Sequence, residues 1–310
     1  ALPILKIMVF DVGGTEIKYS VMDEQMHRTN SGAVPTPQDT QAQFLDAVYR
    51  LYAPHKDEVT GIAMALPGFV DNHTGYVSNG GALLYNTATP VGQLLAEKCS
   101  CPVILENDGK AAAMAELANG ALKGCCNAAV FIIGTGVGGG IIANGQLVRG
   151  VHFTAGEYSF VNTNAEAWDA PDQNMACQCS TSNLLKWYRA RKALPEDAPL
   201  DGRSFFAAAN AGEPEALEVL RRFCHAVAVQ IYNLTVLLDV EKVAIGGGIS
   251  KQPLLLESLR SAYDGLYASR AGQAYMEGLP RCQIVPCAFS SEANQVGVAA
   301  AYFEAMQKKC

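Results

Sequence analysis

Apolar positions in the first half of the chain alternate between short continuous runs and longer segments of helical spacing. The short runs predict buried strands at 4–10, 17–23, 59–66 and 103–106. The longer segments predict a helix over 40–52, capped by Asp39 or Thr40, and an alanine-rich helix from about 107 to 117, ended by Asn119-Gly120. Strands that alternate with helices in this way are typical of an α/β fold.

The second half is mostly helical, with helices predicted over 181–193, 203–209, 214–238, 253–268 and 292–308 and short strands at 243–245 and 283–285. A new strand series opens at Asn127, and Asn144-Gly145 predicts a type I′ hairpin turn within it. Residues 151–176 are polar and aperiodic, which indicates a long functional loop. We expect two domains, 1–122 and 123–290, with the last segment, 291–310, packing back on the first.

The composition of the chain argues against several classes of function. A net charge of −7 without long Lys/Arg clusters argues against nucleic-acid binding, and no apolar stretch is long enough for a membrane span. Ten cysteines are scattered rather than arranged as a disulfide framework, and Ala1-Leu2-Pro3 lack the layout of a signal peptide. We therefore expect a cytoplasmic protein with reduced thiols.

Two glycine-rich turns, 11–15 (Asp-Val-Gly-Gly-Thr) and 134–140 (Gly-Thr-Gly-Val-Gly-Gly-Gly), each lie between two apolar runs. Glycine turns expose backbone N–H groups that can bind polyphosphate. The second turn matches the dinucleotide fingerprint, but a strand and a hairpin follow it instead of a helix, and no P-loop occurs. The repeated strand–turn–strand unit predicts one nucleotide held between two related halves.

Six motifs occur in a specific order: Asp11 to Thr15, Leu66-Pro67-Gly68, Glu106-Asn107-Asp108, 133–140, Ala155-Gly156-Glu157 and Gly246-Gly247-Gly248-Ile249-Ser250. From about Leu5 to Ala305 the chain therefore resembles the ROK family (repressors, open reading frames and sugar kinases), a branch of the actin-like ATPases. The resemblance implies two domains of ribonuclease H-like fold, each with a mixed five-stranded sheet, and a cleft between them. It also implies ATP-dependent phosphorylation of a sugar 6-hydroxyl.

Asp108 is the candidate catalytic residue, since a carboxylate at a strand-to-helix junction can accept a hydroxyl proton. A helix N-cap aspartate is the structural alternative. The resemblance makes Asp108 the general base. Asp11 is the candidate Mg²⁺ residue, directly or through water, and a turn aspartate is its alternative.

The resemblance divides the remaining candidates into two sets. The nucleotide set comprises Gly13, Gly14, Thr15, Gly134, Thr135, Gly136, Gly247 and Gly248, and the sugar set comprises Gly68, Asn79, Asn107, Asp108, Glu157 and Phe160. Asn79 is equally consistent with a turn asparagine, and Lys18, an additional phosphate candidate, with a strand-surface lysine. Glu16 stands where many members of the family have lysine.

The zinc site of the family is degraded in this chain. Phe160 replaces the family histidine, and the cysteine box survives only as Cys177-Gln178-Cys179, with Leu184 and Lys186 at two further positions of the box. Two ligands of four cannot complete a tetrahedral site, so we expect no zinc and interpret both cysteines as free or oxidisable thiols.

The same losses bear on the substrate. Tyr158, Phe160 and Trp168 predict an aromatic site suited to a sugar ring or an aglycone, or they fill the space left by zinc. The pattern resembles the zinc-less β-glucoside kinases, so the expected substrate is a β-glucoside such as cellobiose. A free hexose (glucose, N-acetylmannosamine or allose) is the alternative, and a non-catalytic sugar-binding regulator is a remote one. We expect a homodimer.

Overall fold

The computed structural model describes residues 4–307 and divides into two compact units. The first contains the chain as far as Gly120, Leu147–Ala155 and the segment from Ser291 onward, and the second contains Ala121–Gln146 and Gly156–Ser290. The residues 1–3, on which the expected lack of a signal peptide was based, and the predicted end of the last helix at 308 lie outside the described residues.

The first unit is built on a mixed five-stranded sheet with the strand order β3-β2-β1-β4-β7. Its strands are β1 (Lys6–Val12), β2 (Glu16–Asp23), β3 (Arg28–Pro35), β4 (Ile62–Leu66) and β7 (Val103–Asn107). β1 pairs antiparallel with β2 and parallel with β4, and β4 pairs parallel with β7. A separate two-stranded sheet joins β5 (Phe69–Val70) to β6 (Val77–Asn79).

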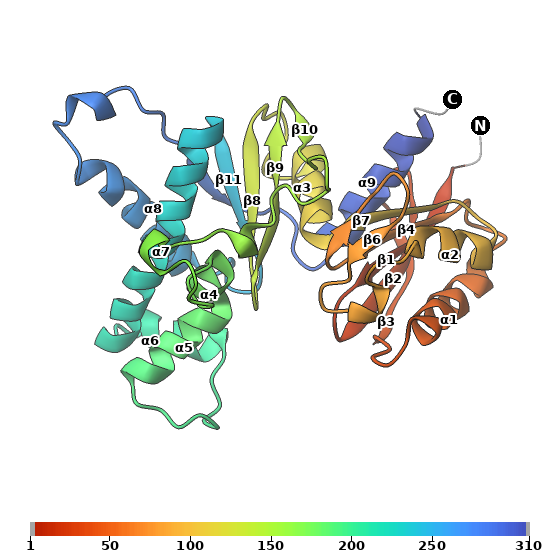
Figure 1. The fold of residues 1–310 in the computed structure, drawn as a ribbon, viewed down its shortest axis with the longest axis horizontal. Coiled ribbons are helices and arrows are strands. Elements are labelled where there is room, and N and C mark those ends of the chain that lie inside the picture. The colour runs from red at the N-terminus through yellow and green to blue at the C-terminus, as the bar shows by residue number, and fades with distance from the viewer. Residues whose placement is uncertain (1–3, 308–310) are drawn as a thin grey trace. The chain divides into compact units, whose positions relative to one another are not determined.

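Helices cover both faces of this sheet (Figure 1). Even-numbered residues of β1 and β4 form one core with α1 (Gln41–Tyr52) and α2 (Val91–Cys99). On the other face lie α3 (Asp108–Asn119) and α9 (Ala293–Gln307), which pack against each other. A Cβ at Gly297 would lie 1.7 Å from the carbonyl oxygen of Ala111, so these two helices meet backbone to backbone.

The second unit has a corresponding sheet with the order β10-β9-β8-β11-β12. Its strands are β8 (Ala128–Ile133), β9 (Val137–Ala143), β10 (Gln146–Leu147), β11 (Lys242–Gly246) and β12 (Gln283–Pro286). Between β9 and β10, Asn144 and Gly145 have φ values of 52° and 72°. These positive values confirm the predicted type I′ turn.

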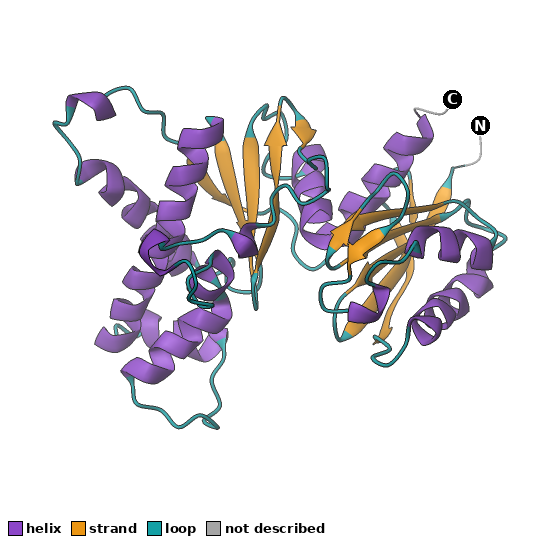
Figure 2. Cartoon of the chain, viewed as in Figure 1, coloured by secondary structure: helices purple, strands orange, loops and turns teal. Residues whose placement is uncertain are grey.

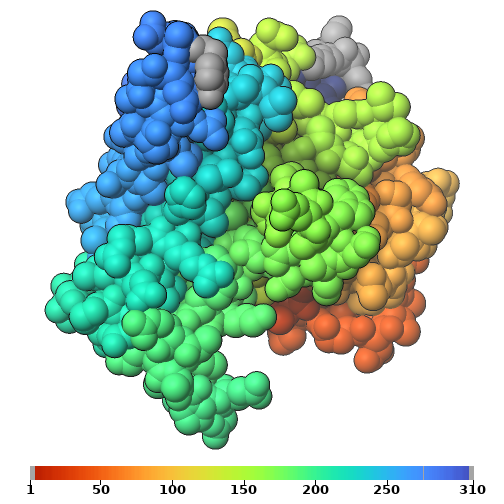
Figure 3. Space-filling model, turned by 60° about the vertical axis from the view of Figure 1, so that its left-hand side comes forward, coloured from red at the N-terminus to blue at the C-terminus, as the bar shows by residue number. Residues whose placement is uncertain are grey.

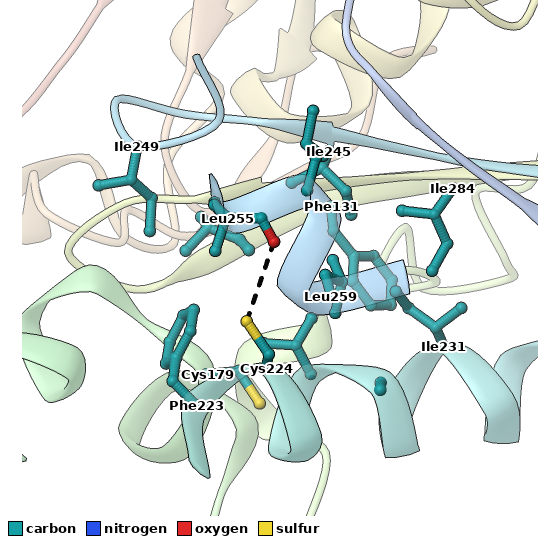
Figure 4. Close-up of a cluster of buried hydrophobic side chains, with 14 of the residues drawn as sticks. Phe131, Cys179, Phe223, Cys224, Ile231, Ile245, Ile249, Leu255, Leu259 and Ile284 are labelled. Carbon is teal, nitrogen blue, oxygen red and sulfur yellow. Dashed lines mark hydrogen bonds between the residues drawn. The ribbon is translucent and has the colours of Figure 1, made fainter. Parts of the chain in front are cut away.

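The helices of the second unit are α4 (Met175–Cys179), α5 (Thr181–Arg191), α6 (Gly202–Asn210), α7 (Pro214–Leu238) and α8 (Pro253–Ala268), and helix predominates beyond the sheet (Figure 2). They share one hydrophobic core with alternate residues of β8 and β11, including Phe131 and Ile245 (Figure 4). Inside it the thiol of Cys224 lies 3.9 Å from the carbonyl oxygen of Leu255, as a weak donor. The loop of residues 192–201 between α5 and α6 protrudes from this unit (Figure 3).

The α/β class and the two five-stranded sheets are confirmed, and α7 and α8 begin and end where their periodicity predicts. Five helices and strands were missed: β3, β5, β6, α2 and α4. β3 has no fully buried residue, so its sequence lacks an apolar pattern, and the other four are short segments in which a period is hard to recognise. Within residues 4–307 no helix has the length and apolar character of a membrane span.

Candidate functional site

The junction of β7 and α3 fixes the position of Asp108, the candidate catalytic residue. Asn107 is the N-cap of α3, because its Oδ1 accepts from the backbone N of Lys110 at 3.0 Å. Asp108 is the first helical residue, half-buried, with Oδ1 accepting from the N of Gly109 at 2.7 Å. The alternative interpretation of Asp108 as the helix cap is therefore wrong, because the neighbouring asparagine has that role.

The sugar candidates of the first unit lie together around Gly68. The Nδ2 of Asn107 donates to the carbonyl oxygen of Gly68 at 2.9 Å. Gly68 has φ +93°, and a Cβ there would lie 2.0 Å from the backbone oxygen of Asn79, so only glycine fits. The Oδ1 of Asn79 accepts from the N of Gly81 at 2.8 Å, as in a turn. The structure thus brings Gly68, Asn79, Asn107 and Asp108 to one place.

A buried ion pair that was not predicted supports this junction. Glu106, 1% exposed, accepts on Oε2 from Nε and Nη2 of Arg149 at 2.9 and 2.8 Å. The other oxygen, Oε1, accepts from the backbone N of Asn107 at 3.1 Å. Arg149 belongs to Leu147–Ala155, which the contacts group with the first unit although the chain on both sides belongs to the second. Glu157 lies two positions beyond this segment and belongs to the second unit.

Asp11 lies near the end of β1 in the same unit and is the first residue of the first glycine turn. Its Oδ1 accepts from Nδ2 of Asn294 at 2.9 Å, and Lys18 is its cross-strand partner. Burial raises the pKa of Asp11, while the hydrogen bond from Asn294 and the charge of Lys18 partly oppose this shift. A buried carboxylate with an incompletely compensated charge is a suitable ligand for a hard cation.

The second glycine turn is fastened to its surroundings within the second unit. The N of Gly134 donates to the carbonyl oxygen of Gly136 at 3.0 Å, and the N of Thr181 donates to that of Gly134 at 2.8 Å. The hydroxyl of Ser159 donates to the carbonyl oxygen of Val137 at 2.8 Å. No atom lies within 4 Å of a Cβ built at Gly134, and its φ is not positive. Neither packing nor conformation therefore requires this glycine, and its role as a nucleotide contact stays a prediction.

A pocket of about 460 Å³ borders this turn, a size typical of small-molecule sites. Its lining comprises Gly134, Thr135, Thr181, Ser182, Leu185, Asp201, Gly202, Arg203, Gly248, Ile249 and Gln252. Three of the nucleotide candidates are among these residues, namely Gly134, Thr135 and Gly248. The residues from α5 and α6 were missed, and the only sequence signal was the capping box of Asp201 and Ser204, which marks a helix start.

The glycine triplet after β11 divides into two kinds. A Cβ at Gly246 would lie 2.5 Å from Cδ1 of Ile132, and Gly247 has φ +96° with its Cβ position 2.1 Å from the oxygen of Ile133. Packing therefore explains both residues. Gly248 has open space and lines the pocket, and the nucleotide-binding roles of Gly247 and Gly248 both stay predictions.

The aromatic residues after Glu157 are placed differently from one another. Tyr158 is buried, donates its hydroxyl to the oxygen of Gly140 at 3.1 Å and packs edge-on against Phe131. The expectation that Tyr158 contributes to a sugar site is therefore wrong, because it belongs to the core of its unit. Phe160 and Trp168 are 70% and 73% exposed.

The two cysteines of the degraded box also differ. Cys179 is fully buried in the hydrophobic core of the second unit (Figure 4), and burial raises the pKa of its thiol to about 12. Cys179 is a free thiol, which is the first of the two alternatives expected for it, and its burial disfavours the second, an oxidisable thiol. Cys177 is half-buried. Among residues 4–307 no three His, Cys, Asp or Glu side chains form a group able to hold a metal, and the lack of zinc remains a prediction.

Two units, each with a mixed five-stranded sheet and a glycine turn between its first two strands, define an actin-like ATPase fold. The chain belongs to the ROK family, whose model matches residues 7–307.

Relatives and solved structures agree with this assignment. A β-glucoside kinase from Listeria innocua is 30% identical over 83% of this chain and 87% of its own length. A glucokinase from Halalkalibacterium halodurans is 30% identical over 78% of this chain and 79% of its own. A ROK family protein from Streptococcus pneumoniae in complex with sucrose has a TM-score of 0.85 at 27% identity, covering 98% of this chain and 100% of that one. A glucokinase from Streptomyces griseus in complex with glucose and AMPPNP has a TM-score of 0.78 at 25% identity, covering 96% and 98%.

Proposed function

We propose that this chain is an ATP-dependent kinase that phosphorylates the 6-hydroxyl of a sugar, with Asp108 as the general base. Its membership in the ROK family and its sugar-kinase relatives support carbohydrate-kinase activity. The single observation that carries the role of Asp108 is its place beside the cluster of Gly68, Asn79 and Asn107. A half-buried carboxylate there can accept a proton from a hydroxyl held by these neighbours.

The proposed reaction is a direct transfer. The carboxylate of Asp108 accepts the proton of the sugar hydroxyl while the oxygen of that hydroxyl bonds to the γ-phosphorus of ATP. The bond between the γ-phosphorus and the oxygen that bridges it to the β-phosphate breaks, and ADP leaves. We assign Gly13, Gly14 and Thr15 of the first unit and Gly134, Thr135 and Gly136 of the second to the phosphates. We assign Gly247 and Gly248 to the adenosine, and the pocket that Gly248 lines supports this choice.

We propose that Mg²⁺ enters with the nucleotide and that Asp11 holds it, directly or through water. When bound, Mg²⁺ neutralises charge on the β- and γ-phosphates. The buried carboxylate of Asp11 at the turn fits an ion of this kind. Mg²⁺ in kinases commonly uses one or two carboxylates together with substrate oxygens.

Our preferred substrate is a β-glucoside such as cellobiose. The exposed rings of Phe160 and Trp168 near Glu157 in the chain favour an acceptor with an additional ring or aglycone. The β-glucoside kinase relative supports the same choice. A free hexose, including glucose, N-acetylmannosamine and allose, is the second candidate, favoured by the glucokinase relatives. We also expect a cytoplasmic homodimer.

A coupled assay of ADP release over a panel of sugars tests the proposal. The panel contains cellobiose, an aryl β-glucoside, glucose, N-acetylmannosamine and allose, each with MgATP. Higher kcat/KM on cellobiose or the aryl glucoside supports the β-glucoside assignment, and turnover of glucose without turnover of either glucoside contradicts it. Binding of sugars without ADP release from any of them would favour the sugar-binding regulator.

A further inference from the structure

The carbonyl groups of the first glycine turn are held by residues that directly follow β3. The hydroxyl of Thr36 donates to the carbonyl oxygen of Gly13 at 2.8 Å, and the backbone N of Thr36 donates to that of Thr15 at 2.9 Å. The side-chain amide of Gln38 donates to the carbonyl oxygen of Gly14 at 2.7 Å. Three successive carbonyl groups of the turn thus bond to two residues.

These bonds determine where the N–H groups of the turn point. In a planar trans peptide the C=O of one residue and the N–H of the next point in opposite directions. The peptides of the turn are trans. Since the carbonyl groups of Gly13 and Gly14 face Thr36 and Gln38, the N–H groups of Gly14 and Thr15 face away from them. That is the arrangement in which a turn presents donors to an anion.

The two side chains differ in burial but act as one clamp. Thr36 is 4% exposed, so its hydroxyl has little access to water. Gln38 is exposed, yet its Nε2 also donates to the carbonyl oxygen of Thr36, at 2.8 Å. Its two hydrogen bonds, to the carbonyl oxygens of Gly14 and Thr36, hold this exposed side chain against the turn.

We propose that Thr36 and Gln38 are positioning residues for the nucleotide phosphates, because they hold the turn with the N–H groups of Gly14 and Thr15 directed at the ligand. This inference rests on the proposed use of ATP. The second unit contains a similar device, in which the N of Thr181 and the hydroxyl of Ser159 bond carbonyl groups of the other turn. In both turns, residues outside the turn thus donate hydrogen bonds to its carbonyl groups.

Calorimetric binding of Mg-AMPPNP and of adenosine to the full chain tests the clamp without relying on turnover. Thr36→Val and Gln38→Ala each remove a donor to the turn, whereas Thr36→Ser keeps the hydroxyl. Thr60→Val is the matched control, because its hydroxyl donates to the carbonyl oxygen of Lys6, 3.1 Å away, outside the turn. Misdirecting one N–H bond to a charged phosphate weakens binding by about tenfold or more.

We expect Thr36→Val and Gln38→Ala to lower the affinity for Mg-AMPPNP about tenfold, while their affinity for adenosine stays within about twofold of that of the unaltered protein. Thr36→Ser and Thr60→Val should bind both ligands as the unaltered protein does. Equal losses for AMPPNP and adenosine, or no loss for AMPPNP, would overturn the positioning role. A selective loss of AMPPNP affinity in a protein that phosphorylates no sugar would uphold the clamp while refuting the proposed kinase.

Discussion

Replacing Arg149 with methionine should strongly destabilise the first unit. The change removes the guanidinium that pairs with Glu106, whose carboxylate is 1% exposed. Methionine keeps much of the aliphatic contact along the side chain, so the lost charge dominates the effect. Glu106 is then left buried with its charge unpaired.

The structure sets the size of this effect. Breaking a buried ion pair from one side costs about 3–5 kcal/mol. The Arg149 side chain is 25% exposed, so water reaches part of the pair and about 3 kcal/mol is the expected loss. For a unit of this size the unfolding temperature falls by about 2–4 °C per kcal/mol, or roughly 6–12 °C in all.

Calorimetry on three variants isolates the charge effect. Arg149→Met should show the full loss, and adding Glu106→Gln should restore more than half of it, because the amide carries no charge. Arg191→Met is the matched control: its pair with Glu218, at 2.8 Å, is about half exposed on both sides and should contribute less than ~1 kcal/mol. A loss at Arg149 no larger than that at Arg191, or no recovery with Glu106→Gln, would refute this explanation.

Three further predictions concern other parts of the chain. Burial raises the pKa of Asp11, so its ionised form destabilises the folded state above that pKa. Without metal, Asp11→Asn should therefore unfold at a temperature equal to or higher than that of the unaltered protein at pH 7.5, and this difference should vanish near pH 4. The variant should be inactive as a kinase. Gly297→Ala should lower the free energy of unfolding by more than about 3 kcal/mol, because its Cβ meets a backbone oxygen. Gly265→Ala in α8, where the Cβ meets open space, should raise the free energy of unfolding by about 0.5–1 kcal/mol, as measured by urea unfolding. Iodoacetamide with mass mapping should label exposed Cys126 in the native protein but not Cys179, which is buried with a thiol pKa raised to about 12.

Local signals in the sequence predicted much of the fold. Proline at the first position of α7 and α8 and their unbroken apolar periodicity placed both helices correctly. The Asn144-Gly145 pair predicted its turn because both residues tolerate positive φ. These features depend on residues near one another in the chain, which is why the sequence alone was sufficient.

Packing between distant segments could not be predicted in this way. Glu106 and Arg149 are 43 positions apart, and nothing in either neighbourhood indicates a pair. Tyr158 and Phe160 lie in one short 3₁₀ turn, yet one is buried and the other exposed, because the turn directs their side chains differently. The glycines at 246 and 247 meet strand β8 across the sheet, so only the structure separates them from Gly248.

The most direct test of the account is the rate of sugar phosphorylation by Asp108→Asn beside the unaltered protein, measured as ADP release with the best sugar of the panel. Asparagine preserves the size of the side chain but cannot accept the hydroxyl proton. We expect kcat to fall by about 10²–10⁴-fold, with sugar and AMPPNP affinities within about threefold of the unaltered protein. Turnover by Asp108→Asn within a few-fold of the unaltered protein would contradict the assignment of Asp108 as the base.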